Sequence, residues 1–190
     1  MRLYLQLAYW VSLLLLCGCY EKRASSPVAQ QVPGYVRTLK QHATARYNQR
    51  IGFYLDLRRP SGQPRFFVLD LRRKQVLAAG LCCSGRTDAQ GRVRYSNTPD
   101  SNCSSHGLAQ VSYAYTGKFG RAYKLVGLQK TNSRIFERFI VLHSHDCVPA
   151  QPQRRAICRS QGCPTVNPAF LRVLSTYIDH SHKPILLYTN

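Results

Sequence analysis

Acidic side chains are scarce in this chain of 190 residues, which has eight Asp and Glu against 27 Lys and Arg and a formal net charge of +19 at pH 7. Because the basic residues are spread along the whole chain, the excess predicts a polyanionic partner or surface. The sequence lacks zinc-finger, helix-turn-helix and aromatic RNA-binding signatures, so nucleic acid is not the predicted partner. A cell-wall polymer or an anionic lipid surface suits the charge equally well.

Long apolar runs are also missing. The segment Leu3–Leu16 is too short for a membrane-spanning helix and follows the basic residue Arg2, so residues 1–18 are predicted to be a secretory signal peptide. The segment runs into Cys17-Gly18-Cys19, which resembles a bacterial lipobox with Cys19 as the lipidated residue, although Cys17 stands where Ala or Ser is usual. An ordinary signal peptide is the alternative. Both versions predict export, with a periplasmic location and, for the lipoprotein, a membrane anchor on Cys19.

Internal repeats and low-complexity tracts are absent, and the length suits one domain after the leader. Residues 19–47 are predicted to hold a polar tether and a short amphipathic helix over 33–47, and residues 48–190 are the predicted domain. A second helix is predicted after the N-cap Asn167 and Pro168. Between the helices lie strand-like runs, which predict a mainly β sandwich or barrel: 51–57, 65–71, 75–82, 107–115, 122–128, 136–145 and 185–188.

A histidine and a cysteine stand out in the stretch from Val141 to Val166. His143 ends an apolar run typical of a buried strand, and the sequence Ser-Gln-Gly-Cys-Pro follows at 160–164. A cysteine is mostly a neutral thiol near pH 7 and becomes a good nucleophile beside a base or a positive charge. Gly162 permits the tight turn that would present Cys163. The pattern predicts a Cys-His catalytic pair, and the long polar segment 83–107 is expected to help shape the substrate cleft.

At these residues the sequence resembles the L,D-transpeptidase family with the YkuD-like catalytic domain, in the branch where Pro follows the cysteine of Ser-x-Gly-Cys. The resemblance covers roughly 48–189 and implies a YkuD-like β fold. It implies Cys163 as nucleophile, His143 as base, and the N–H groups of Gly162 and Cys163 as the oxyanion hole. The Ser144 backbone carbonyl would orient His143. One departure is Thr165, which stands where the larger family usually has a substrate-holding Arg.

The implied substrate is the tetrapeptide of peptidoglycan, from which Cys163 would expel D-Ala to form a thioester. An acceptor amine would give an L,D cross-link, whereas water would make the protein a carboxypeptidase; no metal or organic cofactor is needed. Ser160 is predicted to shape the turn and lie next to the substrate. His145 and Asp146 are predicted to orient the substrate or His143. The alternative from another class is a catalytically silent, basic lipoprotein that binds the cell wall.

The cysteines allow further predictions because an exported protein can form disulfides. Cys147 and Cys158 bracket the loop between His143 and Cys163, so a bond between them is predicted to brace it. A second bond is predicted from Cys103 to Cys82 or Cys83. A zinc site is a further alternative, but its ligand spacing is not one of the usual structural pairs. Its four candidate ligands are His143, His145, Cys158 and Cys163.

Overall fold

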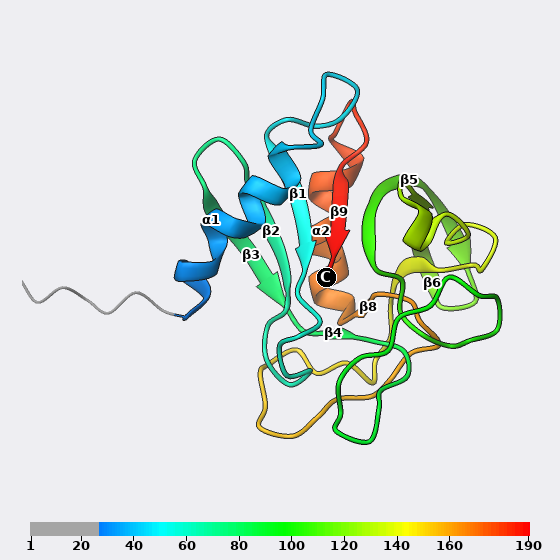
Figure 1. Cartoon of the computed structure of the whole chain (residues 1–190). Coiled ribbons are helices and arrows are strands. Elements are labelled where there is room, and N and C mark those ends of the chain that lie inside the picture. Colours follow the sequence, from blue (N-terminus) through cyan, green and yellow to red (C-terminus); the bar gives the residue numbers. More distant parts are fainter. Residues whose placement is uncertain (1–26) are drawn as a thin grey trace, which may run out of the picture.

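One sheet of nine strands carries the fold of residues 27–190, the part of the chain that the computed structural model describes (Figure 1). The strands lie in the order β3-β2-β1-β9-β5-β6-β7-β8-β4. The edge strands β3 and β4 are separated in the chain by Leu81 alone, so the sheet must curl until its edges approach each other. The result is a nearly closed barrel, which confirms the predicted mainly β fold. The strands are β1 Ile51–Leu55, β2 Phe66–Asp70, β3 Gln75–Gly80, β4 Cys82–Cys83, β5 Gly107–Gly117, β6 Gly120–Gly127, β7 Val141–Ser144, β8 Thr165–Val166 and β9 Leu186–Thr189.

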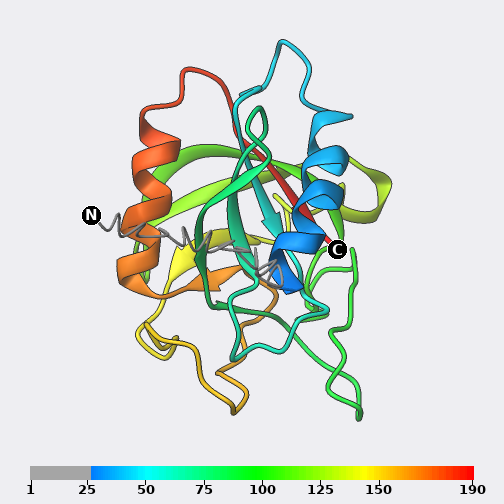
Figure 2. The same cartoon turned by 90° about the vertical axis from the view of Figure 1, so that its left-hand side faces the viewer.

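Two helices cover the sheet from different sides, α1 (Pro27–Lys40) and α2 (Pro168–Asp179), as Figure 2 shows. The central strands are apolar on both faces because both faces are covered. In β1, Phe53 and Leu55 belong to the cluster that includes Leu174 of α2, whereas Tyr54 points into the cluster under α1. The continuous apolar runs of the sequence follow from this double burial.

The first helix begins and ends earlier than the predicted 33–47. Its buried residues are Val32, Tyr35, Val36 and Leu39, so the helix is amphipathic as predicted and packs its apolar side on the domain. Ala43 and Tyr47, which extend the apolar pattern in the sequence, lie in turns after the helix and still contact the same cluster. A turn can therefore continue the burial pattern of a helix. The second helix begins where predicted, with the Asn167 side chain accepting from the Ala169 N–H.

The predicted strand over 136–145 is wrong in its first half. Residues 133–139 form turns, with hydrogen bonds from the Arg138 N–H to the Arg134 carbonyl and from the Phe139 N–H to the Phe136 carbonyl. Phe139 has a left-handed φ of 54° and is 73% exposed, although its ring is large. Such a conformation is uncommon for a bulky residue and is found most often at functional sites. Only Val141–Ser144 pairs as a strand.

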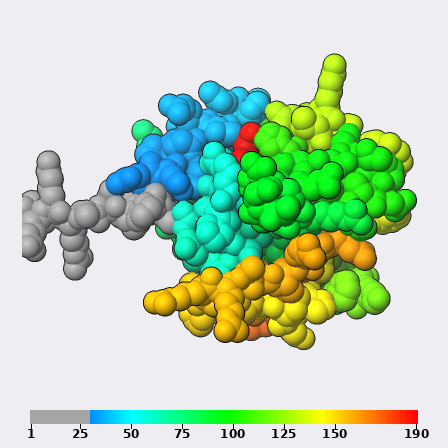
Figure 3. Space-filling view, turned by 60° about the horizontal axis from the view of Figure 1, so that its bottom comes forward, coloured from blue at the N-terminus to red at the C-terminus, as the bar shows by residue number. Residues whose placement is uncertain are grey.

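Three loops meet at one end of the barrel, which lies at the bottom of Figure 1 and is turned toward the viewer in Figure 3. The loop after β7 contacts the loop between β1 and β2, because the Gln153 N–H donates to the Gly62 carbonyl and the Ile157 N–H to the Ser61 hydroxyl. It also contacts the loop after β4 through the Ser160 N–H and the Ser84 carbonyl. A Cβ at Gly62 would lie 2.3 Å from the Gln153 carbonyl oxygen, so this contact requires glycine.

The predictions for the N-terminus fall on residues outside the described part of the chain. These are the signal peptide of 1–18, the lipid anchor on Cys19 and the beginning of the tether. Within residues 27–190, neither helix has the length and apolar character needed to cross a bilayer.

Candidate active site

His143 and Cys163 come from neighbouring parts of the sheet. His143 lies in β7, and Cys163 comes just before β8, which pairs with β7 in parallel so that His143 is in register with Thr165. The His143 N–H also approaches the Pro164 carbonyl, at 3.4 Å. Both predicted residues line one cavity of about 440 Å³. The same cavity is lined by Lys118, Phe119, His145, Cys147, Arg159, Ser160 and Thr165, among others.

The orientation of His143 is fixed through both ring nitrogens. Its Nδ1 lies 3.0 Å from the Ser144 carbonyl oxygen, and its Nε2 lies 3.0 Å from the Thr165 hydroxyl. Because a carbonyl oxygen only accepts, Nδ1 must carry the proton, and Nε2 of the neutral ring keeps its lone pair. The ring is only 8% exposed, and burial lowers its pKa. The geometry presents a neutral imidazole whose basic nitrogen faces a hydroxyl.

The Cys163 thiol does not contact this imidazole. Its sulfur lies 3.5 Å from the Val141 backbone nitrogen and 3.6 Å from the Phe139 carbonyl oxygen. Burial raises its pKa, although the Val141 N–H and the charge of Arg138 act in the opposite direction. Both groups are therefore expected to be neutral near pH 7, and a thiolate-imidazolium pair is not formed in this arrangement. Catalytic hydrogen bonds are often long or absent without substrate, so a rotated thiol remains compatible with catalysis.

Ser160 and Gly162 build the turn that presents the cysteine. The Ser160 hydroxyl donates to the Cys163 carbonyl at 2.7 Å and accepts from the Gly162 N–H at 3.2 Å. Gly162 has a φ of +110°, and a Cβ there would lie 2.5 Å from the Cys103 carbonyl oxygen, so both conformation and space require glycine. The Gly162 N–H is thus engaged within the turn, whereas the Cys163 N–H has no backbone acceptor within residues 27–190.

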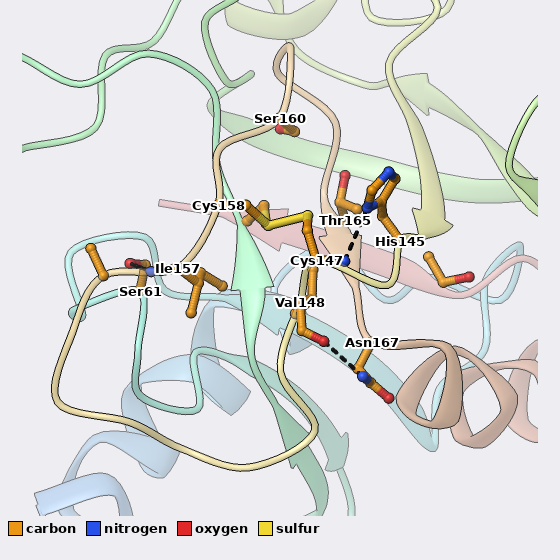
Figure 4. Close-up of a disulfide and its surroundings, with 12 residues drawn as sticks. Ser61, His145, Cys147, Val148, Ile157, Cys158, Ser160, Thr165 and Asn167 are labelled. Carbon is orange, nitrogen blue, oxygen red and sulfur yellow. Dashed lines mark hydrogen bonds between the residues drawn. A yellow bond between two sulfur atoms is a disulfide. The ribbon is translucent and has the colours of Figure 1, made fainter.

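The remaining predicted site residues differ in whether they reach the cavity. His145 is exposed, lines the cavity, and accepts from the Cys147 N–H through its Nδ1 at 3.0 Å (Figure 4). Asp146 is exposed and does not line the cavity. Ser144 contributes its carbonyl, as the family resemblance implied, rather than its hydroxyl. Of the predicted substrate-binding set, His145 and Ser160 reach the cavity and Asp146 does not.

Phe119 is a site residue that the sequence analysis missed. It lies in the tight turn between β5 and β6, and its ring is stacked on His143 with centroids 5.2 Å apart. The Phe119 and His145 rings make a T-shaped contact with the same centroid distance. It remains 49% exposed. A large aromatic residue at a glycine-flanked hairpin tip is unusual, and that was the available signal. The ring restricts the access of water to one face of the imidazole.

Near Cys163, three aromatic rings surround the ammonium of Lys124. Its Nζ lies 5.0 Å from the ring centroids of Tyr115 and Phe139 and 5.2 Å from that of Phe136. No carboxylate pairs with Lys124 in the described part of the chain. Its charge is close enough to lower the pKa of Cys163, against the larger effect of burial. Lys124 was also missed, because it reaches the site only through the pairing of β6 with β7.

The predicted Cys147–Cys158 disulfide is present and forms a wall of the cavity (Figure 4). The predicted second bond from Cys103 is wrong: Cys82, Cys83 and Cys103 are all free. The Cys83 sulfur instead lies against Cys158, with their Sγ atoms 3.2 Å apart, and Cys82 is buried in the core. Because Cys158 is already bonded, it cannot serve in the zinc site considered from the sequence.

Among curated proteins, none matches the sequence. An L,D-transpeptidase from Mycobacterium smegmatis is similar in structure at 10% identity, with a TM-score of 0.44 and 74% of this chain covered. The helical cell shape determining protein Pgp2 from Campylobacter jejuni has 8% identity, a TM-score of 0.46 and 85% of this chain covered. This chain spans 58% and 56% of those proteins, respectively. The family described as L,D-transpeptidase catalytic domain matches residues 22–188, and this chain belongs to that family.

Proposed function

We propose that this protein is a cysteine acyltransferase that acts on peptidoglycan stem peptides through a thioester on Cys163. The observation that carries the proposal is the shared cavity of His143 and Cys163, in which the Ser144 carbonyl fixes the proton on Nδ1 and leaves Nε2 basic. Membership of the L,D-transpeptidase catalytic domain family supports the choice of substrate.

In the proposed first step, the Cys163 sulfur attacks the carbonyl between the diamino acid and D-Ala of a tetrapeptide. His143 takes the thiol proton at Nε2 and passes it to the departing amine, so the C–N bond breaks and D-Ala leaves. In the second step an acceptor amine attacks the thioester and the C–S bond breaks; His143 takes the proton that the amine loses and returns it to the departing sulfur. In the free protein the Thr165 hydroxyl is hydrogen-bonded to Nε2, and this bond must break when the thiol turns toward His143.

The Cys163 N–H is the proposed donor to the oxyanion that forms during attack. The Gly162 N–H can join it only by leaving the Ser160 hydroxyl, which it contacts at 3.2 Å. Lys118 lines the cavity, and the charge of Lys124 is close enough to act on the Cys163 thiol. They are proposed to replace part of the attraction for substrate carboxylates that Arg would provide at the position of Thr165.

The pH dependence of thiol reactivity distinguishes general-base catalysis from a preformed ion pair. Burial raises the pKa of Cys163 and lowers that of His143, so the free thiol is expected to be neutral. The rate of alkylation by iodoacetamide should then rise about tenfold per pH unit from pH 6 to above the ordinary thiol pKa of about 8.5. The rate is followed by intact-protein mass spectrometry, with Cys163→Ala as the background. A plateau beginning below pH 7 would mean that the resting enzyme holds a thiolate.

The location of the protein is part of the proposal and rests on the sequence. Residues 1–18 are proposed to direct export, and Cys19 is proposed to carry a lipid that holds the enzyme at the periplasmic face of a membrane. The net charge of +19 would then favour contact with an anionic envelope.

The deciding experiment is intact-protein mass spectrometry after incubation with a disaccharide tetrapeptide. The expected result is a mass increase equal to the substrate less D-Ala, located on Cys163 by fragmentation and removed by hydroxylamine. Adding a second stem peptide as acceptor separates transpeptidation from hydrolysis, because only transpeptidation yields the cross-linked product. Water as the acceptor would make the protein an L,D-carboxypeptidase.

A silent wall-binding protein is the second candidate, favoured by the turned-away thiol and by Thr165 in place of Arg. This candidate predicts sedimentation with purified sacculi and no thioester with any stem peptide, even when Cys163 is shown to be reduced. The same mass measurement therefore separates the two.

A further inference from the structure

A second cavity, of about 770 Å³, lies beside the cavity that His143 and Cys163 line, which we call the catalytic cavity. It is found where the loops after β1, β4 and β7 meet. Figure 3 shows these segments together, with the orange loop running beneath the cyan and green ones. Arg159 lines both cavities, and the disulfide stands between them, since Cys147 lines the catalytic cavity and Cys158 the second one. The two spaces are therefore neighbours that share a wall. The second cavity is lined by five arginines, Arg58, Arg59, Arg65, Arg92 and Arg159.

Arg65 is the unusual member of this set because it is buried, with 2% of its surface exposed. Its guanidinium donates to the Cys82 carbonyl at 2.6 Å, to the Ser84 hydroxyl at 3.2 Å and to the Arg59 carbonyl at 3.3 Å, all of which are neutral acceptors. Within residues 27–190 no carboxylate lies at ion-pair distance from it. A buried charge is costly unless it is paired, and a guanidinium offers more N–H groups than these bonds use. The cavity wall therefore holds a buried positive charge that no carboxylate contacts directly.

The other arginines add to this charge unequally. Arg58 and Arg92 are paired with Asp56 and Asp88. Arg59 donates to the Pro64 carbonyl and to glutamine side chains, and Arg159 is exposed without an ion pair in the described residues. Arg59, Arg65 and Arg159 thus present positive charge to one cavity, and within residues 27–190 none of them forms an ion pair; Asp56 acts on Arg65 only beyond ion-pair distance.

We propose that this arginine cavity binds the free carboxylates of a stem peptide whose acyl group lies in the catalytic cavity, an inference that rests on the proposed function. Guanidinium forks match carboxylates in shape and charge. The shared Arg159 places the cavity within reach of a ligand that continues from Cys163. Its wall also contains Leu57, Val93 and Ile157, which suit the methyl groups of alanine residues. The site would make the enzyme selective for peptides whose carboxylates are not amidated.

Calorimetric titration of the full chain carrying Cys163→Ala tests this inference without turnover. One ligand is a disaccharide tetrapeptide, and the other is the same compound with every carboxylate except that of D-Ala converted to an amide. Amidation is expected to raise Kd about tenfold, as charged hydrogen bonds are lost. Adding Arg159→Met should reduce that ratio to about twofold, because the variant has already lost one of the contacts. Arg154→Met is the matched control, since Arg154 is exposed on the same loop and does not line the cavity.

Equal binding of the two ligands, no measurable binding of either, or the same ratio in the Arg159 and Arg154 variants would overturn the inference. Displacement of the tetrapeptide by millimolar inorganic phosphate, with no effect of amidation, would assign the cavity to a phosphate-bearing ligand and would also overturn it. Thioester formation on wild-type Cys163 is scored separately by mass, so failure of this inference is distinguishable from failure of the proposed function.

Discussion

The Cys163→Ala variant is expected to form no thioester with a disaccharide tetrapeptide, and the His143→Ala variant to form it about a hundred- to ten-thousandfold more slowly than wild type. The first change removes the attacking sulfur. The second removes the base that must take the thiol proton, because burial keeps the thiol neutral in the free protein. Single-turnover acylation, followed by quenching and intact-mass measurement, gives both rates.

The matched control for the histidine is His182→Ala, since His182 is exposed and lies outside the catalytic cavity. It should acylate at the wild-type rate. If His143→Ala acylated as fast as His182→Ala, the base would have to be another group, and the role of His143 would be structural. Raising the pH should partly restore the His143→Ala rate, because hydroxide can generate the thiolate that the missing base no longer supplies.

The positions of His143 and Cys163 in the fold were predictable because their signals are local. His143 ends an apolar run that folds as a buried strand. Gly162 allows a turn in which a side chain at this position would not fit. The second helix was equally clear, since Asn167 and Pro168 mark its beginning without reference to the rest of the chain. Such signals require only the chemistry of a few adjacent residues.

Residues that depend on distant pairing could not be found in the same way. Lys124 approaches Cys163 because β6 pairs with β7 and places Lys124 opposite Val141. Phe119 covers His143 because the β5–β6 hairpin extends over the end of β7. The sequence does not show which strands pair. Its periodicity therefore identifies the strands but not the residues that face each other on paired strands.

The failed strand prediction over 136–140 has a related cause. Phe136, Phe139 and Ile140 give the segment an apolar character, but only Ile140 packs in the core. The rings of Phe136 and Phe139 are exposed and lie near the Lys124 ammonium. In the sequence these aromatic side chains look like residues of a strand, because the pattern does not show that they are exposed. The arginine cavity was hidden for a similar reason, because its residues come from three separate loops.

The position of Cys83 leads to the second large expected effect. Cys158→Ser should lower the free energy of unfolding by about 2–3 kcal/mol, because it removes the only disulfide within residues 27–190, a cross-link between residues 11 apart in sequence. Cys147→Ser should cost less, within about 1 kcal/mol of wild type. In that variant the free Cys158 sulfur lies 3.2 Å from Cys83, close enough to form a replacement bond after a small shift when the protein refolds under oxidising conditions. Urea unfolding and non-reducing peptide mapping measure stability and connectivity together.

Refolding is the necessary condition because burial raises the pKa of Cys83 to about 11, which leaves little thiolate in the folded protein to start an exchange. The double variant Cys83→Ala/Cys147→Ser removes the replacement partner and should therefore fall to the stability of Cys158→Ser. Cys83→Ala alone retains the native bond and controls for the loss of the buried thiol. Equal destabilisation by Cys147→Ser and Cys158→Ser, with Cys83 still reduced in both, would show that the loop cannot move enough to bring the two sulfurs together. The wall between the catalytic cavity and the arginine cavity would then depend on the Cys147–Cys158 pair alone. Both Cys147→Ser and Cys158→Ser should in that case bind the tetrapeptide more weakly than wild type.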